Sequence, residues 1–319
     1  MTTAAAGHVP VMLDRVRELL APALATAGAV LVDATLGRAG HARALLGDHP
    51  GLTVIGIDAD QAAIDESRQL LAADLRRVRL VRAAYDQLPA ILADLGVSMV
   101  QGVLFDLGVS SPQLDDPGRG FSYSQDAPLD MRMDNSRTLT AADVVNTYPA
   151  ARLARVLRQY GEERFARRIA DAVVRERARE PLTSTSRLAE IVKNSIPAPA
   201  RRSGGNPAKR TFQALRIEVN DELGILERAV PAALDAVAVS GRIVVLAYHS
   251  LEDRIVKRAI SQRATDTTPL GLPVRLESAR PQFRLLTSGA ERPTETELAA
   301  NPRAASARLR AAERVRAAA

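Results

Sequence analysis

The stretch Leu31-Val-Asp-Ala-Thr-Leu-Gly-Arg-Ala-Gly-His41 decides the fold of this chain. Residues 29–32 form a short apolar run, which is typical of a buried strand and too brief for a helix. Gly37 and Gly40 then provide a turn with little side-chain bulk, and a helical pattern follows. A strand, a glycine turn and a helix in this order open a nucleotide-type site in α/β proteins, where ligands lie beyond the carboxyl ends of the strands.

The next apolar run, residues 52–57, ends in Asp58, and an acid at about this distance from the first strand commonly binds ribose hydroxyls. The turn itself reads Gly37-Arg-Ala-Gly40, which lacks the G-x-G of a dinucleotide site and the Gly-Lys-Ser/Thr of a P-loop. The pattern therefore favours an adenosine ligand without phosphates, of which S-adenosylmethionine is the obvious one. An ordinary strand–helix turn remains the alternative.

Composition limits the class of protein. The chain has 319 residues, 46% of them hydrophobic and 25% charged, as in globular proteins of one or two domains. Cysteine is absent, which excludes disulfides, thiolate nucleophiles and cysteine-based metal sites and suits a reducing compartment. Because residues 1–8 lack a signal-peptide pattern and no apolar run reaches about 18 residues, we expect a cytoplasmic protein without a membrane segment.

The net charge of +6 points to a polyanionic partner such as a nucleic acid. Arginines concentrate between residues 152 and 179, in a stretch with helical periodicity. A solvated helical face with ion pairs is the alternative explanation, since net charge reports on association and not on fold.

Strands alternate with helices in the first third of the chain, which predicts a parallel sheet with right-handed crossovers. The predicted strands are residues 29–32, 52–57, 78–81 and 100–107, and the predicted helices are residues 9–24, 62–75 and 88–95. A long segment rich in Gly, Pro, Ser and Asp follows at residues 108–134, and such segments are usually functional.

In the second half of the chain, a purely helical sequence pattern replaces the alternation of strands and helices, which then resumes. Residues 139–194 read as helical and residues 197–207 as an exposed linker, whereas an apolar stripe from Phe212 to Val230 predicts one helix. Further predicted elements are a strand at 243–247, a helix from Ser250 with Asp253 reaching back to cap it, a strand at 283–286 and, from propensity, a helix at 304–315. We therefore expect a first domain part at residues 1–134, an inserted helical subdomain at 135–207 and a second domain part at 208–319.

Polar residues follow several predicted strands, where a parallel sheet would bring them to one edge. They are the turn at 37–41, Asp58, Tyr85, Asp106 and His249. Each has an ordinary structural explanation, such as capping a helix, and their joint placement is what indicates a site.

Several longer sequence motifs resemble those of a known protein family. The chain resembles the bacterial small-subunit ribosomal RNA cytosine-N4-methyltransferases between residues 8 and 303. The matching strings include Asp106-Leu-Gly-Val-Ser-Ser-Pro-Gln-Leu-Asp115, Pro128-Leu-Asp-Met-Arg-Met-Asp134, Tyr160-Gly-Glu-Glu-Arg-Phe-Ala166 and His249-Ser-Leu-Glu-Asp-Arg-Ile-Val-Lys-Arg258.

The resemblance implies a class I methyltransferase, a Rossmann-like α/β fold with an inserted all-α subdomain that binds RNA. It also implies S-adenosylmethionine as methyl donor and a cytidine in the decoding region of 16S RNA as acceptor, in free RNA or in the 30S subunit. By position, the cofactor-binding residues would be Ala39, Gly40, His41, Asp58, Tyr85, Asp106 and Gln113. The resemblance turns the last segment, residues 306–314, into an antiparallel strand, against our own helix prediction.

This chain departs from the family pattern at three places. Arg38 and Ala39 stand where the family's turn is richer in glycine, and Tyr85 and Tyr248 stand where phenylalanine is common. Ala39 retains its backbone groups for cofactor binding, and Tyr85 retains an aromatic ring for packing.

The implied chemistry concerns an exocyclic amine whose lone pair is delocalised into the ring. A hydrogen-bond acceptor for one N4 proton would orient this amine, and Ser110-Ser111-Pro112 occupies the place where amino-methyltransferases carry a polar-Pro motif. His249 or water would take the released proton, and Phe121, Tyr123 and Tyr248 are candidates for stacking on an unpaired base.

The sequence predicts no metal site, although it leaves open whether a metal assists, and it does not decide between a monomer and a homodimer. A non-catalytic assembly factor that retained the cofactor fold is the competing interpretation. A nicotinamide enzyme is disfavoured because the G-x-G is missing.

Overall fold

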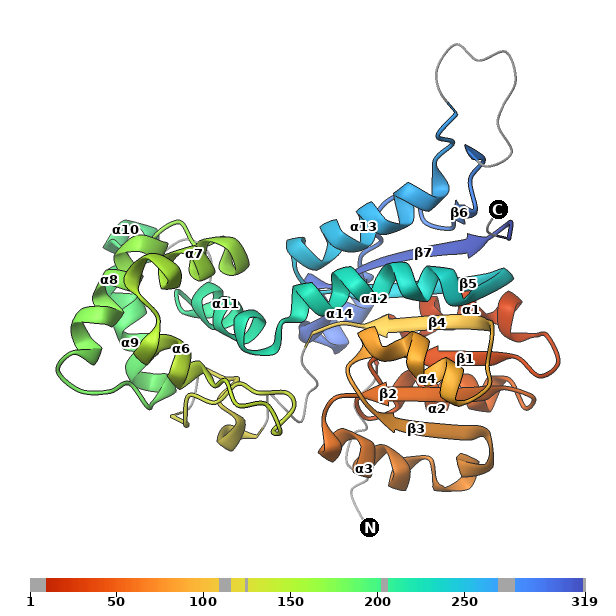
Figure 1. The fold of residues 1–319 in the computed structure, drawn as a ribbon, viewed down its shortest axis with the longest axis horizontal. Coiled ribbons are helices and arrows are strands. Elements are labelled where there is room, and N and C mark those ends of the chain that lie inside the picture. Colours follow the sequence, from red (N-terminus) through yellow and green to blue (C-terminus); the bar gives the residue numbers. More distant parts are fainter. Residues whose placement is uncertain (1–9, 109–115, 124–125, 202–205, 269–278, 318–319) are drawn as a thin grey trace. The chain divides into compact units, whose positions relative to one another are not determined.

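The computed structural model describes residues 10–108, 116–123, 126–201, 206–268 and 279–317. The chain divides into two compact units (Figure 1). The first consists of Met1–Gly108 together with Leu223–Ala319, and the second is Val109–Glu222. Among the described residues, no helix combines the length and the apolar character that crossing a bilayer requires.

The first unit contains a 7-stranded sheet with the order β3-β2-β1-β4-β5-β7-β6. Its strands are β1 (Val30–Asp33), β2 (Thr53–Asp58), β3 (Val78–Arg82), β4 (Val100–Asp106), β5 (Val237–Ala247), β6 (Phe283–Leu285) and β7 (Arg308–Arg314). The first five are parallel, and β7 runs antiparallel to both β5 and β6. The predicted α/β class with a mostly parallel sheet is therefore confirmed.

Helices cover both faces of this sheet. They are α1 (Leu13–Leu24), α2 (Gly40–Asp48), α3 (Gln61–Leu70), α4 (Leu88–Asp94), α12 (Glu222–Ala236), α13 (Ser250–Ala264) and α14 (Glu295–Ala300). Short 3₁₀ turns lie at Ala72–Arg77, Tyr85–Gln87 and Pro302–Ser306. In β1, Leu31 belongs to the core beneath α1 and α2, whereas Val32 belongs to the core beneath α4, α12 and α13, because successive side chains of a strand point to opposite faces.

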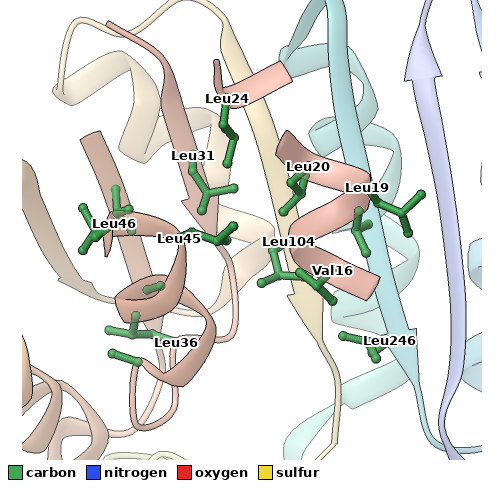
Figure 2. Packing of buried hydrophobic residues seen from close by; sticks show 14 of the residues in the cluster. Val16, Leu19, Leu20, Leu24, Leu31, Leu36, Leu45, Leu46, Leu104 and Leu246 are labelled. Carbon is green, nitrogen blue, oxygen red and sulfur yellow. The ribbon is translucent and has the colours of Figure 1, made fainter. Parts of the chain in front are cut away.

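The core on the α1 side rests on fully buried leucines. Figure 2 shows this cluster, with side chains of α1 beside Leu104 of β4 and Leu246 of β5. Burial of each such side chain contributes about 1.5–3 kcal/mol. This packing fixes the strands whose carboxyl ends carry the candidate site.

The C-terminal segment forms strand β7, as the resemblance implied, and the helix prediction from propensity is wrong. Leu309 and Ala312 are buried on opposite faces of the sheet, and the strand pairs with β5 from Arg242↔Glu313 to Ala247↔Arg308. Pairing with β5 and β6 satisfies the backbone hydrogen bonds of this segment, which a helix would satisfy internally. Tertiary context therefore overrides helix propensity.

The second unit is built from α6 (Ala141–Thr147), α7 (Ala150–Gly161), α8 (Ala166–Arg177), α9 (Thr185–Ser195), α10 (Ala198–Arg201), α11 (Lys209–Asn220) and a 3₁₀ turn at Pro117–Arg119. Residues 139–194 are thus helical as predicted, whereas α10 begins inside the predicted linker. The apolar stripe from Phe212 to Val230 is not one helix, because Asp221 adopts φ +53° and separates α11 from α12.

This unit extends beyond the predicted insertion of residues 135–207 in both directions. On the C-terminal side α11 packs closely against α7, and a Cβ on Gly161 would lie 2.5 Å from the carbonyl oxygen of Arg210. On the N-terminal side Phe121, Leu129 and Met131 lie in the same apolar core as the helices.

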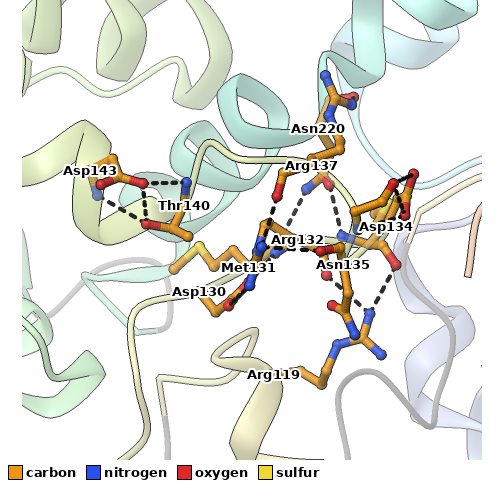
Figure 3. Close-up of polar contacts among 12 residues, drawn as sticks. Arg119, Asp130, Met131, Arg132, Asp134, Asn135, Arg137, Thr140, Asp143 and Asn220 are labelled. Atoms are coloured by element: carbon orange, nitrogen blue, oxygen red, sulfur yellow. Dashed lines mark hydrogen bonds and ion pairs between the residues drawn. The ribbon is translucent and has the colours of Figure 1, made fainter.

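Polar contacts hold the segment before α6 against the end of α11 (Figure 3). The Asn220 amide accepts a hydrogen bond from the Met133 backbone at 2.8 Å and donates one to the Met131 carbonyl at 2.7 Å. The Arg119 guanidinium donates to the carbonyls of Arg132 and Met133 at 3.0 and 2.9 Å. Hydrogen bonds between side chains and backbone hold this segment in place. Such contacts require no regular spacing of apolar residues, so the sequence shows no periodicity here.

Candidate functional site

The turn between β1 and α2 is fixed by two side chains from neighbouring elements. The Gly37 amide donates to Oδ2 of Asp58 at 2.9 Å, and the Ser67 hydroxyl donates to the Gly37 carbonyl at 2.7 Å. Gly37 and Ala39 have φ values of +52° and +54°. A left-handed alanine is strained, so the hydrogen bonds around it keep the turn in a conformation that the sequence alone does not favour.

Asp58 lies at the carboxyl end of β2, as predicted. Its second oxygen, Oδ1, accepts from the Asp60 amide at 2.9 Å, and burial raises the pKa of Asp58 to about 6. The Ala59 backbone is a third donor to this carboxylate. Because a carboxylate offers about four acceptor positions, one remains for a hydroxyl-bearing ligand. The side chain thus shapes the turn and fits the ribose role predicted for it.

The start of α2 is covered by the N-terminal segment. A Cβ on Gly40 would lie 2.5 Å from Cγ of Pro10, which explains why glycine is needed at this position. His41 is buried, and its Nε2 lies 3.0 Å from the Val11 carbonyl oxygen. A carbonyl can only accept, so Nε2 carries a proton.

Asp106 at the end of β4 is the centre of a polar cluster. Its amide donates to the Thr35 hydroxyl at 2.6 Å, and its Oδ1 accepts from the Tyr248 hydroxyl at 2.7 Å. Its Oδ2 lies 3.7 Å from Nδ1 of His41. Burial, together with the charge of Asp106, raises the pKa of Tyr248 well above its ordinary value, so the phenol stays protonated and remains a donor.

Tyr248 has a role that sequence reasoning missed. It was predicted as a stacking aromatic, whereas its hydroxyl binds Asp106 and its ring lies against Gly108, where a Cβ would be 3.4 Å from Cδ2 of the ring. The tyrosine in place of the family's common phenylalanine was a usable signal, because a buried phenol needs a hydrogen-bond partner.

Asp33, at the end of β1, is a second residue that the predicted site did not include. It is 2% exposed and accepts from the Thr35 amide at 3.3 Å. Burial, and secondarily repulsion from Asp106 and Asp58, raises the pKa of Asp33 to about 7. The ends of β1, β2 and β4 therefore carry three carboxylates, Asp33, Asp58 and Asp106, which we name the acidic rim.

Tyr85 lies in the 3₁₀ turn after β3. Its ring meets Phe105 of β4 edge to face, with the centroids 5.6 Å apart. The predicted role of Tyr85 in cofactor binding stays a prediction.

His249 is the N-cap of α13, so the predicted capping role of Asp253 is wrong. The Glu252 amide donates to Nδ1 of His249 at 3.3 Å, and Nε2 lies 3.0 Å from Oε1 of Glu252. Glu252 also accepts from the backbone amides of Tyr248 and His249. Asp253 instead binds Arg310 of β7 at 2.6 Å. The catalytic role of His249 stays a prediction.

The remaining predicted residues divide into two groups. Ser110, Ser111, Pro112 and Gln113 lie outside the described residues. Phe121 is buried in the core of the second unit, and Tyr123 packs edge to face against Phe212 with the centroids 5.6 Å apart. In this structure both aromatics contribute to the packing of the helices.

Sequence comparisons with known proteins cover nearly the whole chain. A ribosomal RNA small subunit methyltransferase H from Thermobifida fusca is 65% identical over 98% of this chain and 94% of its own length. The protein of the same name from Salinispora arenicola is 62% identical over 97% of this chain and 83% of its own length. A solved rRNA methylase from Streptococcus thermophilus aligns with 97% of this chain at 13% identity and a TM-score of 0.42. The model of the MraW methylase family matches residues 5–315, and the chain belongs to this family.

Proposed function

We propose that this protein transfers a methyl group from S-adenosylmethionine to the N4 amine of a cytidine in the decoding region of 16S ribosomal RNA. Relatives more than 60% identical over nearly the full chain are named as small-subunit ribosomal RNA methyltransferases. The observation in the structure that carries the proposal is the acidic rim beside the glycine turn.

The charge of this rim discriminates between nucleotide ligands. Three carboxylates at neighbouring strand ends repel phosphates, and the pKa values of Asp33 and Asp58 are raised chiefly because burial disfavours their charged form. A ligand that combines an adenosine with cationic groups and lacks phosphates relieves the repulsion among these carboxylates. A pyrophosphate-bearing cofactor would increase it.

The residues that would hold the donor are Ala39, Gly40, His41, Asp58, Tyr85, Asp106 and Gln113. Asp58 has acceptor capacity for a ribose hydroxyl, and Asp106 is held in one orientation by Tyr248 and Thr35. When bound, S-adenosylmethionine supplies an electrophilic methyl group.

The chain itself must supply positioning. We propose that Ser110-Ser111-Pro112 provides the hydrogen-bond acceptor for one N4 proton. This hydrogen bond directs the nitrogen lone pair toward the methyl group. Positioning of this kind lowers a reaction barrier by about 7–11 kcal/mol in favourable cases. His249 or water takes the released proton. Nδ1 of His249 accepts the capping hydrogen bond of α13, so Nε2 is the ring atom that we assign to this proton.

The experiment that tests this proposal is mass mapping of methylcytidine in small-subunit RNA incubated with the protein and isotopically labelled donor. We expect one labelled N4-methylcytidine in the decoding region, with free 16S RNA and 30S subunits compared as substrates. Exchanging Ser110 and Ser111 for alanine should lower transfer while donor binding persists. Donor binding without transfer to either substrate would instead favour a non-catalytic assembly factor.

A further inference from the structure

A cleft of about 370 Å³ lies on the second unit, between α8 and α9. Four arginines line it, Arg168, Arg175, Arg179 and Arg187, together with a single acid, Glu176. The first three are spaced by seven and four residues along α8 and the turn after it, which places them on one side of the helix. Arg187 comes from α9 and completes the cluster.

The arginines of this cleft are unequally paired. Glu176 binds Arg187 at 2.6 Å and Arg179 at 3.2 Å, and Glu190 of α9 also binds Arg187, at 2.9 Å. Arg168 and Arg175 are exposed and have no carboxylate within 4.0 Å among the residues that the structure describes. Two arginines that line one cleft thus have no carboxylate partner among the described residues, an arrangement that a bound anion would stabilise.

The lining also indicates which kind of anion fits. A guanidinium group binds phosphate oxygens with two parallel hydrogen bonds, and several in a row match a repeating phosphate chain. Interfaces with proteins usually centre on buried aromatic anchors, and the residues that line this cleft include no aromatic side chain. The chemistry therefore favours a polynucleotide backbone over an acidic protein surface.

We propose that this arginine cleft binds the phosphodiester backbone of the RNA substrate, and that Glu176 limits the affinity because it pairs with two of the four arginines. The proposal rests on the proposed function and identifies where on the helical insertion the RNA is held. Phosphate contacts of this kind position the RNA and carry no sequence information.

The test uses the full chain and a fluorescently labelled RNA hairpin with the sequence of the decoding region. Binding is followed by anisotropy at several salt concentrations, for the wild type and for the double variant Arg168→Ala/Arg175→Ala. Loss of two phosphate contacts should weaken binding roughly ten- to thirtyfold at about 0.1 M salt and reduce the salt slope by about 1.4–1.8. The matched control is Arg155→Ala/Arg158→Ala on α7, which removes the same charge from exposed positions outside the cleft and should change both quantities much less.

A variant that gains affinity separates this idea from simple misfolding. Glu176→Gln removes the carboxylate that binds Arg179 and leaves Arg187 paired with Glu190 alone, so RNA binding should tighten several-fold and the salt slope should grow. Equal losses in the two double variants, or unchanged binding in Glu176→Gln, would overturn the proposal. If Arg168→Ala/Arg175→Ala binds the hairpin normally but has a raised KM on 30S subunits, the cleft contacts a ribosomal protein. That result would overturn the proposal as well.

The same measurements distinguish failure of the cleft from failure of the proposed function. Methylation of RNA by the wild type, with normal hairpin binding by the cleft variant, contradicts only the cleft. A wild type that binds the hairpin through these arginines and methylates no RNA contradicts the proposed function and leaves the cleft intact.

Discussion

Replacement of Asp33 by asparagine should stabilise the fold at pH 8 and leave its stability nearly unchanged at pH 4. Asp33 is 2% exposed at the end of β1, and burial raises its pKa from the ordinary 3.8 to about 7. At roughly 1.4 kcal/mol per pH unit, this difference corresponds to about 4 kcal/mol of unfavourable ionisation in the folded state. Asparagine keeps an oxygen that accepts the hydrogen bond from the Thr35 amide and removes the charge. We expect a net gain of about 2–4 kcal/mol, because the new amide group must also find partners.

The sign follows from proton linkage. Below about pH 4 the side chain is protonated in both the folded and the unfolded chain, so the charge has no effect. Between about pH 4 and pH 7 the unfolded chain loses the proton while the folded chain keeps it, and the free energy of unfolding of the wild type falls as the pH rises. Asp58, with its pKa raised to about 6, adds a slope of the same sign. Asp58 is present in both proteins, so the difference between them mainly reports Asp33.

Urea unfolding followed by circular dichroism at a series of pH values measures this difference, with the slope against urea checked for two-state behaviour in each protein. The variant should gain stability over the wild type progressively between pH 4 and pH 7 and then reach a plateau. If the difference in the free energy of unfolding does not vary with pH, or if the variant is less stable than the wild type at pH 8, the pKa of Asp33 is not raised in the folded protein.

Three further changes test other parts of the structure. Asp106→Ala should abolish methylation, measured as label transferred to RNA, and unchanged turnover would remove this residue from the site. Tyr248→Phe removes the donor to Asp106, and donor affinity measured by calorimetry should fall about tenfold, or roughly 1.4 kcal/mol; equal affinity would show that the hydroxyl does not position Asp106. Gly161→Ala forces a Cβ against the Arg210 carbonyl and should lower the free energy of unfolding by about 1–3 kcal/mol, whereas the control Gly47→Ala, in α2 with open space around it, should raise it by about 0.4–1 kcal/mol.

The sequence was most informative where one physical signal acted alone. The first four strands are short apolar runs followed by polar residues, and parallel pairing needs no further information to bring their carboxyl ends together. For this reason Asp58, Asp106 and the turn at Gly37 could be placed at one edge of the sheet before the structure was known. Which residue caps α13 depends instead on atomic geometry, and both His249 and Glu252 were missed in that role.

Elements stabilised by partners distant in sequence were predicted poorly from local patterns. Strand β7 is rich in alanine and arginine, and only its pairing with β5 and β6 makes it a strand. The break between α11 and α12 depends on Asp221 with φ +53°, and the apolar stripe continues across it without a visible signal. The bond between Tyr248 and Asp106 joins residues 142 positions apart, so the tyrosine could signal a buried hydrogen-bond partner but no local motif could identify Asp106 as that partner.

The two units carry features of opposite charge, and the proposed reaction requires both. A methyl donor with a sulfonium group is stabilised by carboxylates nearby, and the acidic rim of Asp33, Asp58 and Asp106 supplies them, with raised pKa values at Asp33 and Asp58. An RNA substrate needs guanidinium groups, which the rim would neutralise if they were built into the same strand ends. Placing the arginines on a separate helical unit keeps Arg168 and Arg175 free of carboxylate partners within the described chain. Under the proposed function, a cationic cofactor and a polyanionic substrate call for surfaces of opposite charge, and the chain carries one of them on each unit.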